Sequence, residues 1–277
     1  MDGNRNNKRK RYGKCALCGN ICELTFEHIP PRKAFNWFPQ KTVTGNEIFK
    51  MIKGDKKPWD FNGLHYKNEQ RGTGRYSLCQ SCNNKTGSWY GEEYVKFVEG
   101  FHYLMQKEKP EPGMIMHVEE ATFRPLPVLK QIVSMFCSLH QIDENNELFD
   151  LLRAFVLDKT ARNFPKDRIR IGMYLFGGGT LRQAPITAIV KCQEDGNRIE
   201  VLSEIVTYPM GYIMYFDPDK NLKMPCADIT EFCDTNFEEE CKVQIQLPVY
   251  ECNIPFPADF RSKSELIKCV EDNRRDR

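Results

Sequence analysis

The sequence predicts an α+β fold with antiparallel strands, and two kinds of apolar pattern support that prediction. Apolar residues recur at helical spacing over residues 125–136 and again over residues 148–155. Four shorter β-rich runs follow, at residues 168–176, 186–193, 198–208 and 211–216. Asp195-Gly196 separates two of these runs and supplies the positive φ of a tight hairpin turn, so we expect neighbouring strands to pair antiparallel.

Composition divides the chain of 277 residues into three parts. Residues 1–14 are polar and basic without periodicity, which predicts a flexible arm. Residues 15–109 are dense in cysteine, aromatic and basic residues, and a helical run of aromatic residues lies toward their end. Two prolines and a glycine at residues 110–113 then interrupt the chain. They predict a boundary, after which residues 110–277 form the α+β domain, for which targeting, partner binding and dimerisation all remain open roles.

The near-neutral net charge of +2 averages two opposite halves. Residues 1–110 hold 20 Lys+Arg against 11 Asp+Glu, whereas residues 111–277 hold 20 against 27. A basic segment attracts polyanions, so the first half is expected to bind nucleic acid. The acidic second half argues against a second general clamp on the same polyanion.

The chain has neither an apolar N-terminal segment typical of secretion nor a run of about 18–20 apolar residues typical of a membrane span. These observations predict a cytoplasmic protein without membrane partners. Twelve cysteines in such a chain indicate metal ligation or burial rather than a disulfide framework.

Two Cys-x2-Cys pairs are the strongest motif, Cys15 with Cys18 and Cys79 with Cys82. Each short loop can turn two thiolates toward one ion, and four thiolates in a tetrahedron are typical of structural Zn²⁺. The sequence therefore predicts a zinc site that clips the two ends of a long segment together. Cys22, close to the first pair, is assigned to packing.

Glu27-His28-Ile29-Pro30-Pro31 follows the first pair, and Asn83 follows the second directly. Here the sequence resembles the HNH nucleases, also called ββα-metal or His-Me finger nucleases, in the branch supported by zinc. The resemblance covers about residues 14–100 and implies a zinc-stabilised ββα-metal finger with endonuclease activity. It implies that Glu27 and Asn83 bind a catalytic Mg²⁺ or Mn²⁺ and that His28 is the general base. DNA is the favoured substrate. Because family members of this size act in prokaryotic restriction and phage defence, the resemblance implies such a role for this chain.

The chemistry of these residues agrees with that resemblance. A histidine with an ordinary pKa can accept a proton from water near neutral pH. A carboxylate and an amide oxygen suit a hard cation that keeps open positions for phosphate oxygens. Adjacent strand residues point to opposite faces, so Glu27 and His28 can share a site only at an irregular strand end, which Pro30-Pro31 supplies.

The chain departs from the family pattern in the residues around the base. The usual asparagine that orients the histidine is absent before Cys79, where the sequence reads Gly72-Thr73-Gly74-Arg75-Tyr76-Ser77. A backbone carbonyl of that stretch, Asn62 or Asn68 could orient His28 instead. The family usually has a lysine three residues after the metal-binding asparagine. This chain has Thr86 at that position, and Lys85 stands one place earlier.

The long segment between His28 and Cys79 mixes basic with aromatic residues, a composition that suits phosphate contact and base stacking. Arg71, Arg75 and Lys85 are the candidate phosphate contacts; glycines beside the two arginines allow close approach. The alternative is a small aromatic core with a solvated basic rim. The alternative function is a zinc-stabilised nucleic-acid-binding protein without catalysis.

Overall fold

The computed structural model describes residues 10–44, 46–47, 63–140, 146–178, 181–193 and 196–250, without the side chains of residues 40 and 189–198. Residues 1–9 of the predicted arm, residues 45 and 48–62 of the long segment before Cys79, and Asp195 of the predicted turn lie outside the described residues. None of the helices in the described ranges combines the length and apolarity that a membrane span needs.

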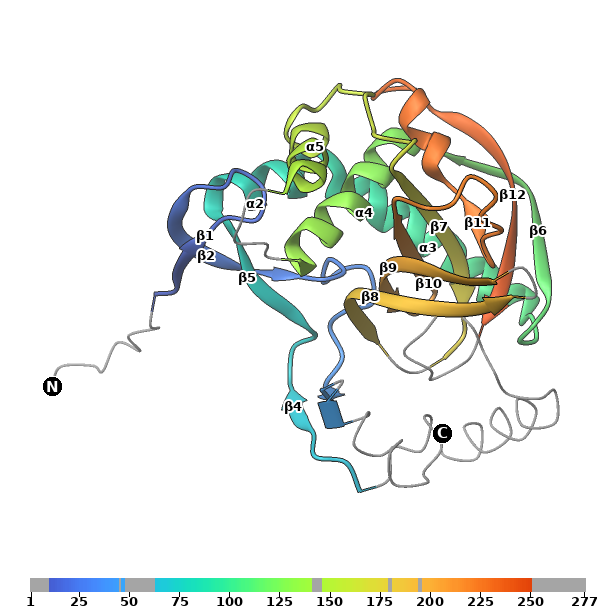
Figure 1. Ribbon diagram of the computed structural model, residues 1–277, viewed down its shortest axis with the longest axis horizontal. Coiled ribbons are helices and arrows are strands. Elements are labelled where there is room, and N and C mark those ends of the chain that lie inside the picture. Colours follow the sequence, from blue (N-terminus) through green and yellow to red (C-terminus); the bar gives the residue numbers. More distant parts are fainter. Residues whose placement is uncertain are drawn as a thin grey trace, which may run out of the picture.

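A small finger forms the N-terminal end of the described chain (Figure 1). Strands β1 (Tyr12–Lys14), β2 (Ile21–His28) and β5 (Gly74–Cys79) form an antiparallel sheet in the order β1-β2-β5. Helix α2 (Gln80–Thr86) follows β5 directly. Strands β2 and β5 with helix α2 therefore make the predicted ββα arrangement, and β3 (Gln40–Thr42) and β4 (Lys67–Glu69) pair within the intervening segment.

Helix α2 runs into a single π-helical turn, η1 (Gly87–Gly91), and then into α3 (Glu92–Glu108). The predicted aromatic helical run is thus confirmed. A π-helical turn is a rare structure that occurs frequently at functional sites. In this chain η1 follows α2 of the finger directly, and both of its terminal residues are glycines.

The larger sheet has the order β6-β12-β7-β10-β9-β8, with β11 paired to β7. Its strands are β6 (Ile115–Phe123), β7 (Ile169–Phe176), β8 (Arg182–Gln193), β9 (Gly196–Thr207), β10 (Met210–Phe216), β11 (Ala227–Asp228) and β12 (Cys241–Tyr250). Strands β7 to β10 confirm the four predicted runs, and β8 and β9 form the predicted hairpin. All pairs are antiparallel except β12 with β7.

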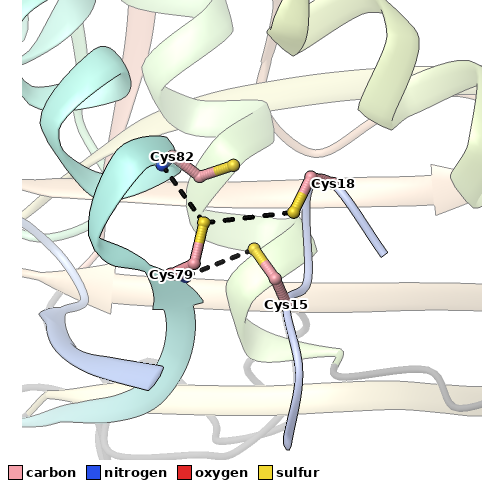
Figure 2. Close-up of side chains that lie close together, drawn as sticks. All are labelled: Cys15, Cys18, Cys79 and Cys82. Carbon is pink, nitrogen blue, oxygen red and sulfur yellow. Dashed lines mark hydrogen bonds between the residues drawn. The ribbon is translucent and has the colours of Figure 1, made fainter. Parts of the chain in front are cut away.

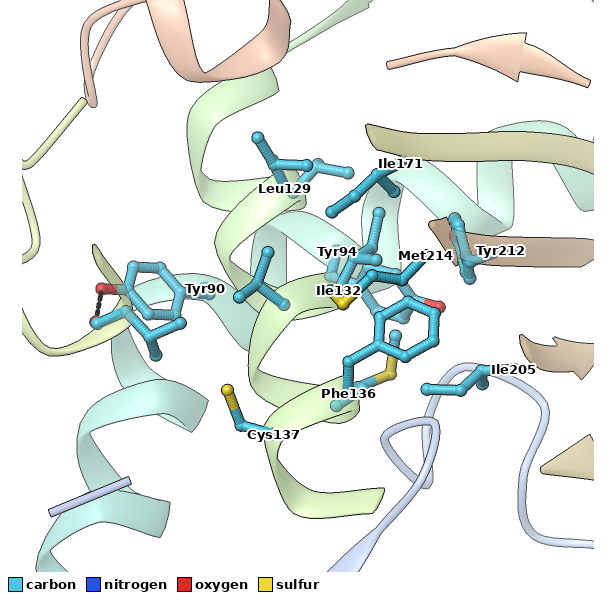
Figure 3. Packing of buried hydrophobic residues seen from close by; sticks show 14 of the residues in the cluster. Tyr90, Tyr94, Leu129, Ile132, Phe136, Cys137, Ile171, Ile205, Tyr212 and Met214 are labelled. Atoms are coloured by element: carbon cyan, nitrogen blue, oxygen red, sulfur yellow. Dashed lines mark hydrogen bonds between the residues drawn. The ribbon is translucent and has the colours of Figure 1, made fainter. Parts of the chain in front are cut away.

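Helix α4 (Pro125–Leu139) lies between the finger and the large sheet (Figure 1). Every one of its residues is buried, and it packs against α5 (Glu147–Leu157), α3, η1, β5 and the short 3₁₀ helix η2 (Thr230–Asp234). Figure 3 shows Leu129, Ile132 and Phe136 of α4 in one cluster with side chains of α3 and of the sheet. This core is continuous across the predicted boundary at residue 110.

His140 caps the C-terminal end of α4. From its surroundings we predict that the free energy of unfolding of the protein depends on pH. Its side chain is 8 % exposed, and its Nε2 lies 2.9 Å from Ser203 Oγ. Burial, with a smaller contribution from the Arg75 charge, lowers the pKa of His140 to about 4. The unfolded chain, with an ordinary pKa near 6.5, binds the proton more strongly between these values, so stability falls as the pH falls through that window.

We expect the free energy of unfolding to fall by about 2 kcal/mol between pH 7.5 and pH 5 through this group alone. His140→Gln keeps an N–H donor for Ser203 but does not titrate. Urea unfolding of both proteins at the two pH values isolates the contribution, because all other titrating groups are shared. An equal loss of stability in the variant would contradict the assignment.

Candidate functional site

The four predicted cysteines form one cluster at the base of the finger (Figure 2). Cys15 and Cys18 lie in the connection between β1 and β2, whereas Cys79 ends β5 and caps α2. Their four Sγ atoms lie within 4.8 Å of one another, and the Sγ atoms of Cys18 and Cys79 are 3.9 Å apart. Four thiolates at about 2.3 Å from a tetrahedral zinc ion are about 3.8 Å from each other. The donor set therefore fits a zinc ion.

Backbone N–H groups point at these sulfur atoms, as is expected where thiolates bind a metal. The N–H of Cys79 donates to Cys15 Sγ at 3.3 Å, and that of Cys82 donates to Cys79 Sγ at 3.4 Å. Hydrogen bonding from the Cys82 thiol, against burial and with further backbone donors, lowers the pKa of Cys15 to about 4. Because thiolate is the metal-binding form, this environment favours ligation.

Glu27, His28 and Asn83 line one pocket of about 210 Å³ beside the finger. Glu27 and His28 are the last two residues of β2, directly before Ile29-Pro30, and Asn83 lies in α2. The three predicted residues are thus brought together although more than fifty positions separate the first two from the third. Both residues line the pocket although they pair in register with Arg75 and Gly74, and the shift in register of β2 lies earlier, between Thr25 and Phe26.

His28 is held in one tautomer by a backbone carbonyl. Its Nε2 lies 3.1 Å from the carbonyl oxygen of Arg71. A carbonyl can only accept, so Nε2 carries the proton and Nδ1 keeps its lone pair. Burial, with the nearby Arg32 charge, lowers the pKa of His28 despite the opposing effect of that hydrogen bond. The imidazole is therefore neutral at pH 7 and able to accept a proton.

A buried asparagine holds the backbone that orients His28. Asn36 Nδ2 donates to the carbonyls of Pro30 and Thr73, each at 2.7 Å, and its Oδ1 accepts from the N–H of Thr73 at 2.8 Å. Gly72 has φ of +84°, and a Cβ there would lie 2.0 Å from the Asn36 carbonyl oxygen. Asn36 therefore joins the end of β2 to the segment that carries the Arg71 carbonyl.

The group that orients His28 is thus the backbone carbonyl of Arg71, which lies one residue before the stretch 72–77 that the sequence suggested. Asn68 is exposed on β4, paired with Lys41 of β3, and Asn62 lies outside the described residues.

Glu27 and Asn83 present oxygen atoms that suit a hard cation. Within the described chain, the Glu27 carboxylate has no hydrogen-bond or ion-pair partner, and burial raises its pKa to about 7. Asn83 Nδ2 donates to Thr25 Oγ1 at 3.0 Å, and that hydroxyl donates to the Leu78 carbonyl. Because Nδ2 is engaged with Thr25, Oδ1 is the acceptor left for the pocket. A half-buried carboxylate that has no partner in the described chain, beside an amide oxygen, fits a divalent cation.

The three predicted phosphate contacts lie around the pocket rather than in its wall. Arg71 acts on the site through its carbonyl, Lys85 lies over the Trp89 ring at 5.8 Å, and Arg75 is half-buried and acts on the pKa of His140. Arg32, four residues after His28, lines the pocket instead. It is exposed, so its guanidinium is free to meet an anionic group at the pocket mouth.

Several residues of the site were not predicted. Arg32 lies four residues after His28, and this short distance in sequence is the feature that could have indicated its place in the pocket. Asn36 carried no signal, because asparagines are common in loops. Gly87, Gly91 and Gln131 also line the pocket. Gln131 is a polar residue in a mostly apolar helical pattern, but Lys130 and Ser134 share that property, so the sequence does not single it out.

No family model matches this chain, and neither a curated protein nor a solved structure matches it significantly.

Proposed function

We propose that this protein is a metal-dependent endonuclease of the HNH type that hydrolyses phosphodiester bonds, with DNA as the favoured substrate. One observation carries the proposal: His28, with a free Nδ1 and a carbonyl-bound Nε2, shares a pocket with Glu27 and Asn83. A zinc-binding module alone requires none of these three residues. A role in restriction or phage defence extends the proposal by resemblance only.

The residues divide the chemistry of hydrolysis among them. His28 Nδ1 takes the proton from the attacking water, while the Arg71 carbonyl stabilises the imidazolium that forms. Glu27 and Asn83 would hold a Mg²⁺ or Mn²⁺ ion, which supplies positive charge to the phosphate and the leaving oxygen. Arg32, which lines the pocket, would hold a neighbouring phosphate of the substrate.

Aromatic residues continue from His28 along the strands and support binding of nucleic acid. The Phe26 ring lies 5.0 Å from the His28 ring and 5.4 Å from that of Tyr76, with which it pairs across β2 and β5. The Arg11 guanidinium lies 4.4 Å over the Tyr76 ring. Phe26 and Tyr76 are 38 % and 36 % exposed, so bases can stack on them.

His28→Ala tests the proposal. We expect the wild-type protein to convert supercoiled plasmid DNA to the nicked form with Mg²⁺ or Mn²⁺, and the variant to be slower by about 10²–10⁴-fold, the usual contribution of a general base. His117→Ala is the matched control, because His117 is exposed on β6, and it should cleave at the wild-type rate.

An RNA of the same sequence, assayed beside the plasmid, decides between the two substrates. If wild type and His28→Ala are equally inert on both, the nuclease proposal fails. Retained binding of nucleic acid in that case would support the alternative of a non-catalytic zinc-stabilised binding protein.

A further inference from the structure

Gln131 of α4 is a buried polar residue that its own surroundings leave unsatisfied. The side chain is 2 % exposed, and its Oε1 is fully buried without a hydrogen-bond partner among the described residues. Buried polar groups usually have hydrogen-bond partners. The neighbouring Lys130 does, because its Nζ donates to the carbonyls of Phe155 and Asp158. A buried acceptor without a donor is unfavourable, so one that persists calls for a ligand.

The position of Gln131 indicates what that ligand is. Although α4 belongs to the second half of the chain, Gln131 lines the same pocket as Glu27, His28 and Asn83. The Glu27 carboxylate and the Asn83 Oδ1 are acceptors, and Gln131, whose Oε1 lacks a donor among the described residues, adds a third acceptor to the lining residues. Oxygen acceptors from three side chains suit a cation, and Arg32 is the cationic side chain of the same lining.

Two glycines of the pocket lining leave room for such an ion and its substrate. Gly87 and Gly91 begin and end η1, and both line the pocket. A Cβ at Gly87 would meet no atom within 4 Å, and one at Gly91 would meet only the Thr86 carbonyl oxygen at 4.0 Å. Packing does not require glycine at either position. Two glycines inside a helix lower its stability, so their presence beside the pocket agrees with a need for open space.

We propose that Gln131 supplies, through Oε1, a third protein oxygen ligand to the divalent cation that Glu27 and Asn83 bind. The inference rests on the proposed function and deepens it, because the second half of the chain then completes the metal site of the finger. An uncharged carbonyl oxygen is a suitable ligand for Mg²⁺ or Mn²⁺, and it leaves the remaining positions to phosphate oxygens and water.

Binding of Mn²⁺ to the zinc-loaded full chain, followed by electron paramagnetic resonance of the free ion, tests the ligand role without reference to cleavage. We expect Gln131→Leu to weaken Mn²⁺ binding by about tenfold or more. Gln131→Glu places a carboxylate oxygen at the same position and should restore binding or strengthen it. Gln80→Leu, at an exposed position of α2, is the control and should bind Mn²⁺ as the wild type does.

Thermal unfolding separates this effect from misfolding. Gln131→Leu removes an unpaired buried acceptor and keeps a similar volume, so its unfolding midpoint without Mn²⁺ should equal or exceed that of the wild type. Its cleavage rate should recover as the Mn²⁺ concentration is raised.

Unchanged Mn²⁺ affinity in Gln131→Leu, together with its loss in Glu27→Ala, would overturn the proposal and leave Gln131 to hold a water molecule. Loss of cleavage at unchanged Mn²⁺ affinity in both Gln131 variants would assign its N–H to the substrate and also overturn it. A wild-type protein that binds Mn²⁺ through Glu27 but cuts no nucleic acid would refute the nuclease proposal alone. A wild-type protein that binds no Mn²⁺ would refute both.

Discussion

Cys82→Ser is expected to release zinc from the protein and to unfold the finger. Cys82 is 4 % exposed and lies with the other three cysteines in one cluster. The cluster joins the β1–β2 connection to the start of α2, two segments that a long stretch of sequence separates. A structural zinc site contributes about 10–16 kcal/mol to the folding of small zinc domains, more than the finger's few buried residues can replace. We therefore expect both metal and ordered finger structure to be lost.

Metal analysis of the purified chain and hydrogen exchange of the β2 and β5 amides measure these two losses. Wild type should hold one zinc ion, and its β2 and β5 amides should be protected. Cys22→Ser is the matched control, since Cys22 is a half-buried thiol close to the cluster but outside it. Zinc retained in Cys82→Ser, or lost in Cys22→Ser, would contradict the four-cysteine assignment.

Asn36→Ala is expected to destabilise the protein and to disable His28 without touching it. The substitution removes three hydrogen bonds of a fully buried amide, so the Pro30 carbonyl and the Thr73 N–H lose the Asn36 partner, while the Thr73 carbonyl keeps the N–H of Ile29. At about 1 kcal/mol or more for each, the free energy of unfolding should fall by about 3 kcal/mol. The segment that carries the Arg71 carbonyl is then released, so the His28 tautomer is no longer specified.

Imidazole ¹⁵N shifts of His28 report this effect independently of cleavage. Wild type should show the tautomer protonated at Nε2, and Asn36→Ala a mixture of tautomers with a reduced cleavage rate below its unfolding temperature. Asn84→Ala serves as the control, because Asn84 is an exposed residue of α2, and surface changes usually stay within about 0.5 kcal/mol. An unaltered His28 signal in Asn36→Ala would show that Asn36 only stabilises the fold.

The elements that could be predicted from sequence are those whose apolar pattern is strong. Helix α4 is buried along its whole length and strand β10 at every residue, so their patterns are dense. Strands β6 and β12 were not predicted. They pair with each other and alternate exposed with half-buried residues, and β12 contains a proline, so neither resembles a buried strand.

The candidate site also contains a part that could be predicted from the sequence and a part that could not. Glu27, His28 and Asn83 could be named because they belong to short motifs beside the cysteine pairs. The group that orients His28 could not be chosen, since a backbone carbonyl carries no residue identity. Only the folded chain shows that the carbonyl belongs to Arg71 and that Asn36 supports it.

The sequence by itself determined the two cysteine pairs, the motif at the end of β2 and the α+β class, because each depends on spacing between near neighbours. The tertiary structure decided that Gln131 of the acidic half reaches the pocket of the basic half, and that one core joins the two. The physical reason is that satisfaction of a buried polar group depends on which distant segments pack around it. No local pattern in the chain records that packing.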